Sequence, residues 1–233
     1  MKNILITGGG SGIGAATAQI LIEKGHQVHL MGRNQEKLAA FSQSYPNKCS
    51  FTVGDVRNVA DCQKTFEEAK SKMGSVDVLI NNAGLGIFDP LAQAKLEDWH
   101  EQVDTNIKGV LNMIHFSLHE LIARRGHIIN LGSVASHHVF ANSGVYCATK
   151  HAVLAIGESL KIEHGKNIRI TTICPGAVNT PFIHATKNED LLKEYVPNFE
   201  KGLNPKDIAA QMAHVIEAPE GVNISEIIIR PGV

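Results

Sequence analysis

The 233-residue sequence predicts an α/β fold in which one parallel sheet of about seven strands is covered by helices on both faces. Short apolar runs that are typical of buried strands alternate along the chain with longer stretches that are typical of helices. Right-handed crossovers between such strands make a doubly wound, Rossmann-type sheet the expected arrangement. No linker, repeat or low-complexity tract divides residues 1–233, so we expect a single domain.

The elements are expected in regular alternation along the chain. Strands are predicted at residues 2–7, 27–31, 49–54, 76–81, 127–131, 168–173 and 226–230. Helices are predicted at residues 35–44, 59–73, 96–123, 145–164 and 205–218, and a further helical pattern begins within the first glycine cluster. A ligand of such a sheet lies beyond the carboxyl ends of the strands. The residues that end or follow the strands should therefore line one edge: Gly8, Gly32, Asp55, Asn81, Ser133 and Pro175.

The first strand leads through a glycine-rich turn directly into the first helix. Glycines let the backbone approach a pyrophosphate closely, and a helix N-terminus supplies free N–H groups and a favourable dipole. The spacing is Thr-Gly-x-x-x-Gly-x-Gly, and its setting between a strand and a helix predicts a dinucleotide phosphate site. The residues predicted to form this site are Gly8, Gly10, Ser11, Gly12, Ile13 and Gly14.

A tyrosine and a lysine stand four residues apart in the predicted helix 145–164. Tyr146 and Lys150 therefore share a face, one turn from each other. An ammonium near a phenol favours the phenolate, so we expect Lys150 to lower the pKa of Tyr146 and make it a general acid and base. An isolated Tyr-x-x-x-Lys is usually an exposed helix pair, so this interpretation depends on the other motifs.

Together with Asn81-Asn82-Ala83-Gly84 and Ser133, these motifs resemble the short-chain dehydrogenase/reductase family, in the family's order, from Thr7 to at least Thr180. The resemblance implies that Tyr146 is the general acid in reduction and the general base in oxidation. It implies that Ser133 orients and polarises the substrate carbonyl and that Lys150 also bonds the nicotinamide ribose. Asn106 matches the family position that braces a kinked helix and a water. The alternative is a helix-interior polar residue with local bonds only.

The same resemblance assigns the remaining cofactor contacts. Asp55, followed by Val56, matches the aspartate that contacts adenine, although it could instead be a turn or N-cap aspartate. The segment Asn82, Ala83 and Gly84 is implied to border the adenosine side. The nicotinamide carboxamide is implied to lie against Pro175, Gly176, Val178 and Thr180.

The residue after the second strand indicates which dinucleotide is used. In dinucleotide folds that select NAD, an acidic residue stands about 20 positions after the glycines. Here Arg33 stands at that place, 33 − 14 = 19 positions after Gly14. A guanidinium can form a fork on the 2′-phosphate of NADP, so NADP(H) is predicted and NAD(H) is the less favoured alternative. Ser11 stands where many NADP-using members have a second basic residue. Ser11, Asn34 and Lys37 are candidates to assist Arg33.

The bulk composition limits the partners and the compartment. A formal net charge of −1 argues against a nucleic-acid or membrane-surface partner, and no apolar run has the length of a membrane span. Four scattered cysteines without Cys-x-x-Cys are typical of a reduced, cytoplasmic protein. His115 and His119 are a feasible ligand pair but have no evident third ligand nearby, so no metal is predicted. His137 and His138 are expected to border the substrate.

The predicted function is an NADP(H)-dependent oxidoreductase that interconverts a carbonyl and an alcohol on a small molecule. A 3-oxoacyl (acyl-carrier-protein or CoA) reductase and a 3-hydroxy acid dehydrogenase are the specific alternatives, beside an NAD-dependent enzyme and a non-catalytic sensor. Residues 181–204 resemble the family's substrate lid and contain both apolar and charged side chains, which do not identify the substrate. The helices at 96–123 and 145–164 resemble the family's subunit interface, which implies a homodimer or homotetramer.

Overall fold

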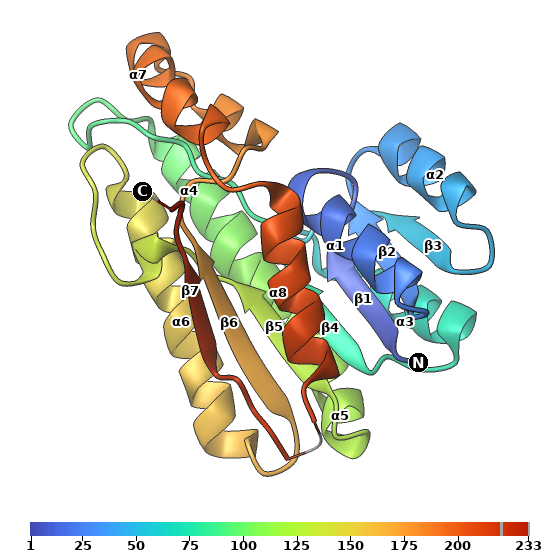
Figure 1. Cartoon of the computed structure of the whole chain (residues 1–233). Coiled ribbons are helices and arrows are strands. Elements are labelled where there is room, and N and C mark those ends of the chain that lie inside the picture. The colour runs from blue at the N-terminus through green and yellow to red at the C-terminus, as the bar shows by residue number, and fades with distance from the viewer. Residues whose placement is uncertain (220, 233) are drawn as a thin grey trace.

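The computed structural model describes residues 1–219 and 221–232 as one doubly wound α/β domain, which confirms the predicted fold class (Figure 1). Its seven strands form a single sheet in the order β3-β2-β1-β4-β5-β6-β7, and every neighbouring pair is parallel. The strands are β1 (Asn3–Thr7), β2 (Gln27–Gly32), β3 (Cys49–Val53), β4 (Val78–Asn81), β5 (His127–Leu131), β6 (Arg169–Pro175) and β7 (Glu226–Ile229).

Helices cover both faces of this sheet because successive strand residues point to opposite sides. Ile4 and Ile6 of β1 pack towards α1 (Gly12–Glu23) and α8 (Pro205–Glu217), and these two helices lie side by side. Leu38 of α2 (Gln35–Ser44) belongs to the same core. Leu5 packs on the opposite face, which is covered by α3 (Val59–Met73), α5 (Gly109–Ala123) and α6 (Gly144–His164).

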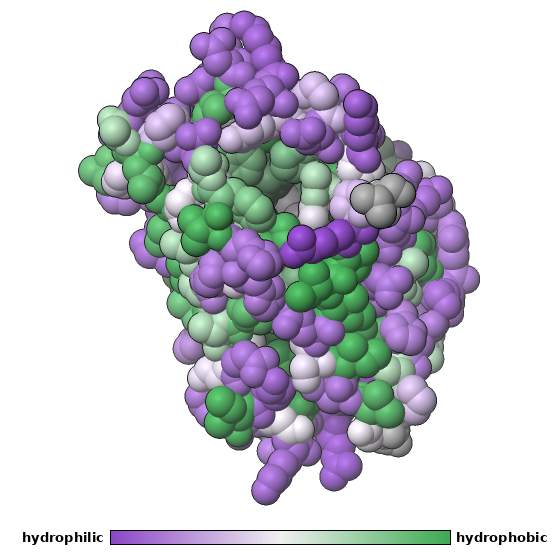
Figure 2. Space-filling model, turned by 60° about the vertical axis from the view of Figure 1, so that its left-hand side comes forward, coloured by the Kyte–Doolittle hydropathy of each residue, from purple (hydrophilic) through white to green (hydrophobic). Residues whose placement is uncertain are grey.

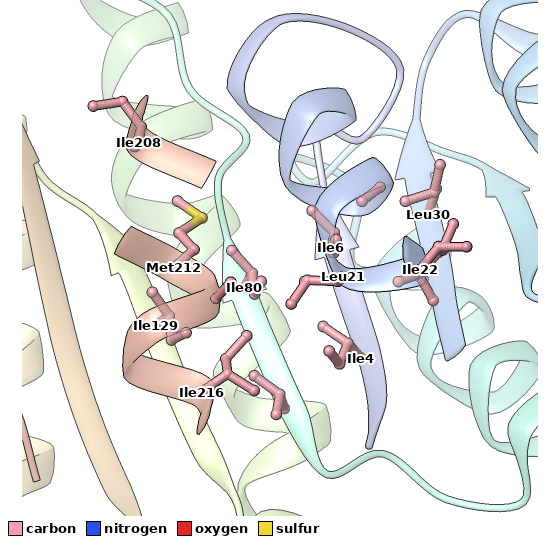
Figure 3. Close-up of a cluster of buried hydrophobic side chains, with 14 of the residues drawn as sticks. Ile4, Ile6, Leu21, Ile22, Leu30, Ile80, Ile129, Ile208, Met212 and Ile216 are labelled. Atoms are coloured by element: carbon pink, nitrogen blue, oxygen red, sulfur yellow. The ribbon is translucent and has the colours of Figure 1, made fainter. Parts of the chain in front are cut away.

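The first of these two cores is drawn in Figure 3, where Ile4 and Ile6 lie close to Leu21 and Ile22 of α1. Met212 and Ile216 of α8 close the cluster on the side of Ile80 and Ile129. Burying one such side chain completely contributes about 1.5–3 kcal/mol. The two cores pack against both faces of the sheet beneath the edge where the strands end.

The strand order reverses beside β1, which pairs with β2 on one side and with β4 on the other. A ligand crevice forms at such a reversal because the connecting chains leave in opposite directions. Here Thr7 Oγ1 accepts hydrogen bonds from the backbone N–H of Asn82 (3.1 Å) and Ala83 (3.0 Å), and Asn82 Nδ2 donates to the Thr7 carbonyl at 2.8 Å. The loops after β1 and β4 are thereby locked together.

The structure departs from the predicted elements in two regions. The predicted helix 96–123 is interrupted by a π-helix at Asp104–Lys108, which separates α4 (Leu96–Val103) from α5. The region 181–204, for which no helix was predicted, contains a 3₁₀ helix at Pro181–Ala185 and the helix α7 (Glu189–Glu200). Pro197 inside α7 obscured its helical pattern, since proline is disfavoured in helix interiors.

Elsewhere the predicted ends are wrong by no more than two residues. The largest shifts are at β4, which starts at Val78 instead of residue 76, and at β6. The strand β6 continues to Pro175 because β7 pairs with it there, Pro175 opposite Ile229. None of the described helices combines the length and apolar composition that crossing a bilayer requires.

Candidate active site

A cavity of about 1030 Å³ opens at the carboxyl edge of the sheet, and Figure 2 shows a hollow bordered by both hydrophobic and hydrophilic residues. Every residue predicted for catalysis or cofactor binding lines this cavity except Gly14 and Asn106. The predicted residues that line it are Gly8, Gly10, Ser11, Gly12, Ile13, Arg33, Asn34, Asp55, Val56, Asn82, Ala83, Gly84, Ser133, Tyr146, Lys150, Pro175, Gly176, Val178 and Thr180.

The glycine loop forms one end of the cavity and requires glycine at several points. Gly8 and Gly12 have φ values of 67° and 54°, which disfavour residues with a side chain. A Cβ on Gly14 would lie 2.4 Å from the Gly8 carbonyl oxygen, so Gly14 lets α1 pack against the loop and lies behind the cavity wall. Ser11 is the N-cap of α1 but makes no capping hydrogen bond with its side chain, which leaves an open helix N-terminus facing the cavity.

Arg33 follows β2 and is exposed at the predicted adenosine end. Asn34 Oδ1 accepts a hydrogen bond from the Lys37 backbone N–H at 2.9 Å and so caps α2. This oxygen is therefore already engaged, which leaves Asn34 fewer groups for the predicted contact with the cofactor. Lys37 itself lines the cavity, one helical turn beyond Arg33. The carboxylate of Asp55 accepts bonds from the Arg57 backbone at 3.0 Å and from its Nε at 2.9 Å.

The bonds from Arg57 match the alternative interpretation of Asp55 as a turn aspartate. Partial burial of Asp55 raises its pKa, but the hydrogen bonds from Arg57 outweigh burial and hold the pKa below its ordinary value. Asp55 is therefore ionised at neutral pH, and it lines the cavity as well. Its predicted contact with adenine stays a prediction.

Ser133, Tyr146 and Lys150 meet on one wall. Ser133 begins the 3₁₀ helix Val134–Ser136, where its Oγ accepts from the Ala135 N–H at 3.1 Å and donates to the Pro175 carbonyl at 3.4 Å. Tyr146 and Lys150 lie one turn apart in α6 and are 9% and 6% exposed. Lys150 Nζ donates to the Leu131 carbonyl at 2.7 Å and lies 5.8 Å from the centre of the Tyr146 ring.

Burial controls the protonation of this pair. It raises the pKa of Tyr146 to about 12, while a hydrogen bond with Ser133 lowers it by a smaller amount. Burial also lowers the pKa of Lys150 to about 8. In this structure the pKa of Tyr146 therefore lies above its ordinary value, and the expected net lowering is wrong, because removing both groups from water disfavours each charged form.

Asn106 lies in the π-helix and is 1% exposed. Its Nδ2 donates to the Leu85 carbonyl at 2.8 Å and to Thr149 Oγ1 at 3.0 Å, and its Oδ1 accepts from the Leu85 N–H at 2.9 Å. The alternative of purely local bonding is wrong, since these partners are 21 and 43 residues away along the chain. Asn106 instead joins the loop after β4 to α6 beside Lys150, from behind the cavity wall.

Aromatic rings enclose the space beside Tyr146, and sequence reasoning identified only part of this wall. The Phe88 ring centre lies 5.5 Å from that of Tyr146, 6.2 Å from Phe182 and 6.0 Å from Tyr195. Phe182 and Tyr195 fall in the predicted lid region. Phe88 was missed because it follows a motif assigned to the cofactor, and Arg230 was missed although it follows the last strand, where the edge rule could have found it.

The region 181–204 is fastened to the loop that carries Phe88. The Thr186 hydroxyl accepts from the Phe88 N–H at 3.2 Å, and Asn188 Nδ2 donates to Asp89 at 2.8 Å. Lys187 forms an ion pair with Asp98 of the following helix α4. This region covers the aromatic end of the cavity. Its movement as a lid stays a prediction.

Two of the predicted substrate neighbours lie outside the cavity lining. The described lining of the cavity includes neither His137 nor His138, and their place beside the substrate stays a prediction. His137 Nε2 forms a hydrogen bond with Glu226 of β7, and the Cys174 thiol donates to Glu226 at 3.3 Å. These three are the one His/Cys/Asp/Glu group in residues 1–219 and 221–232 that is close enough to hold a metal. We interpret them as a hydrogen-bonded cluster that ties β7 to the segment after Ser133, because each group already has a protein partner.

A doubly wound sheet with a hydroxyl, a phenol and an ammonium beside a glycine loop defines a dinucleotide-dependent oxidoreductase. The chain belongs to the short-chain dehydrogenase family, whose pattern matches residues 2–191. It is an enzyme of the kind that acts on CH–OH groups.

Individual relatives cover nearly the full chain. An uncharacterised oxidoreductase of Staphylococcus saprophyticus is 38% identical over 99% of this chain and 96% of its own. A serine 3-dehydrogenase of Rhizobium radiobacter is 36% identical over 98% of this chain and 93% of its own. The closed form of a serine dehydrogenase complexed with NADP⁺ superposes with a TM-score of 0.92 at 32% identity, covering 98% of this chain and 94% of that one.

Proposed function

We propose that this protein is an NADP(H)-dependent dehydrogenase of small 3-hydroxy acids, with Tyr146 as its general acid and base. The observation that carries the proposal is that Ser133, Tyr146 and Lys150 line the same cavity as the glycine loop and Arg33. A non-catalytic sensor would need neither Tyr146 nor Lys150, and both are present and held in place.

The cavity fits a dinucleotide phosphate. A cavity of about 1030 Å³ is large enough for cofactor and substrate together, and glycines line the end where a backbone must approach the phosphates. Arg33 and Lys37 supply two cations at the adenosine end, which supports NADP(H) over NAD(H). Thr180 lies near Gly12, since a Cβ on that glycine would be 3.2 Å from Thr180 Cγ2, so one cofactor could contact both segments. The cofactor, when bound, supplies or accepts the hydride.

The protein's own part is orientation and proton transfer. In reduction Ser133 Oγ donates a hydrogen bond to the substrate carbonyl, and Tyr146 gives its phenolic proton to the same oxygen as it gains charge. In oxidation the Tyr146 phenolate removes the hydroxyl proton. Lys150 lies next to the Tyr146 ring, anchored on the Leu131 carbonyl, and stabilises the phenolate when it is charged. Asn106 positions the two segments around Lys150 without lining the cavity.

Two features support a 3-hydroxy acid as the substrate class. Relatives that match almost the whole chain are named serine dehydrogenases, and serine carries its hydroxyl on carbon 3 of an acid. The aromatic wall of Phe88, Phe182 and Tyr195 encloses the space beside Tyr146, which suits a small molecule better than a long acyl chain. A 3-oxoacyl reductase is therefore the second choice.

A substrate screen tests this proposal. Purified protein with NADP⁺ is expected to oxidise serine, threonine or 3-hydroxybutanoate, measured as NADPH absorbance, faster than unsubstituted alcohols of equal length. The same preparation is assayed with NADPH and a 3-oxoacyl thioester as the matched alternative. Exclusive turnover of the thioester would replace the 3-hydroxy acid assignment. Tight NADPH binding without turnover of any alcohol or ketone would favour the sensor.

We also propose a homodimer or homotetramer formed through α5 and α6. Both helices expose apolar side chains, with Leu111 45% and Ile162 82% exposed, which a subunit contact would remove from water. Light scattering at micromolar concentration is expected to give at least twice the monomer mass of 25.2 kDa. Changing Leu111 and Ile162 together to Glu should shift the protein towards monomer, whereas a wild-type monomer would refute the proposal.

A further inference from the structure

Arg230 follows β7 and lines the cavity. Pairing between Pro175 and Ile229 fixes its backbone, and the Gly176 N–H donates to the Ile229 carbonyl at 2.7 Å. A Cβ on Gly176 would lie 3.8 Å from the Arg230 Cα. Because Ser133 Oγ donates to the carbonyl of Pro175, Arg230 is anchored close to the group that should orient the substrate.

The charges around the cavity are unevenly distributed. Of the described residues that line it, Arg33, Lys37, Lys150 and Arg230 are cationic, and Asp55 is the one with a carboxylate side chain. Arg33, Lys37 and Asp55 belong to the adenosine end, after β2 and β3. Lys150 donates to the Leu131 carbonyl beside Tyr146. Arg230 is thus the remaining cation, and its backbone lies beside the Pro175–Gly176 segment that Ser133 contacts. No hydrogen bond or ion pair to its guanidinium is found within residues 1–219 and 221–232.

A guanidinium in this position is suited to one kind of ligand. Its planar fork matches a carboxylate with two parallel N–H···O bonds. The wall beside Tyr146 is aromatic, so a carboxylate held there would find little other compensation from that wall. No described lining residue there carries the negative charge that would recognise an ammonium.

We propose that Arg230 binds the carboxylate of the substrate and thereby selects 3-hydroxy acids, with or without a 2-amino group, over neutral alcohols. This inference rests on the proposed function and adds the specificity residue to it. Arg230 takes no part in proton or hydride transfer. It holds the acid so that its 3-hydroxyl reaches Ser133 and Tyr146.

The experiment compares 3-hydroxybutanoate with its neutral isostere 3-hydroxybutanamide in NADP⁺ reduction by wild type, Arg230→Ala and Arg230→Lys. The ratio of kcat/KM for acid over amide is expected to fall at least about tenfold in Arg230→Ala, mainly through KM, because even one charge-assisted hydrogen bond of the fork corresponds to about that factor. Arg230→Lys should recover part of the ratio because it keeps the charge without the fork. Lys206→Ala, which removes an exposed cation outside the described cavity lining, is the matched control and should keep the wild-type ratio.

Several outcomes would overturn the proposal. An equal fall in kcat/KM for acid and amide in Arg230→Ala would assign Arg230 to folding. A larger NADP⁺ dissociation constant in this variant would assign it to cofactor binding. If wild type oxidises none of serine, threonine and 3-hydroxybutanoate, the proposed function fails, and Arg230 is tested separately by ligand-observed NMR with butanoate and butanamide on the NADP⁺ complex. Butanoate binding that is lost in Arg230→Ala supports the carboxylate site. Equal binding to both proteins, or none to wild type, refutes it.

Discussion

Tyr146→Phe is expected to lower turnover by about 10²–10⁴-fold, the usual contribution of general acid–base catalysis, while NADPH binding is kept. The substitution removes only the hydroxyl, and the ring keeps its contacts with Phe88 and Phe182 at 5.5 Å. Steady-state rates in both directions, together with NADPH affinity from fluorescence titration, measure the effect. Tyr45→Phe, which removes a phenol outside the described cavity lining, is the matched control and should retain full turnover.

The pH dependence supplies a second readout for Tyr146. Burial raises the pKa of Tyr146 to about 12, so the phenol is protonated across the neutral range. The general acid that reduction needs is therefore present at neutral pH. Oxidation needs the phenolate, whose population rises about tenfold per pH unit below the pKa. The wild-type oxidation rate should therefore climb with pH, and Tyr146→Phe should lose this dependence. Near-normal turnover in Tyr146→Phe, or an unchanged pH profile, would exclude Tyr146 as the proton donor.

Arg33 is expected to set the preference for NADP(H) over NAD(H). A guanidinium fork on the 2′-phosphate forms charge-assisted hydrogen bonds worth about 1.5–3 kcal/mol each. Since about 1.4 kcal/mol corresponds to a factor of ten, Arg33→Ala should weaken NADP(H) binding tenfold or more. NAD(H) lacks that phosphate and should change little. Arg33→Asp should go further, because a carboxylate repels the phosphate and accepts hydrogen bonds from the ribose hydroxyls of NAD(H).

The measurement is the ratio of kcat/KM with NADPH to that with NADH for wild type, Arg33→Ala and Arg33→Asp. Lys48→Ala removes a half-buried cation outside the described cavity lining and serves as the control for net charge. A ratio that stays constant across the three proteins would make Arg33 a surface residue. A wild type that already prefers NADH would contradict the cofactor prediction itself.

The features predicted well from the sequence are those with a local signal. Short apolar runs predicted where the strands of the sheet lie, because buried parallel strands are apolar on both faces. The edge that binds ligands followed from topology alone, and for this reason residues as far apart as Gly8 and Thr180 were correctly expected at one cavity. The Tyr146 and Lys150 pair followed from helical spacing.

The features that were missed depend on tertiary contacts. Phe88 and Arg230 reach the cavity only because the loop after β4 and the end of β7 pack beside Tyr146 and Pro175. The protonation of Tyr146 was misjudged for the same reason. Helical spacing places an ammonium near the phenol, but it does not report that both groups are buried.

The π-helix at Asp104–Lys108 has a consequence for the length of this part of the chain. The buried face of this helical segment runs from Asp98 to Leu121 and recurs once per turn over six turns. These six turns span 121 − 98 = 23 residues, whereas six turns of a regular α-helix need about 22. The widened turn therefore absorbs one surplus residue. Deleting a residue here would rotate the apolar face of α5 by about 100° relative to α4. Either the face bearing Met113 would turn out of the core, or Asn106 would turn away from Leu85 and Thr149. We therefore expect this segment not to tolerate the insertions and deletions that surface loops accept. Its length must be kept so that Met113 faces the core while Asn106 faces Leu85 and Thr149.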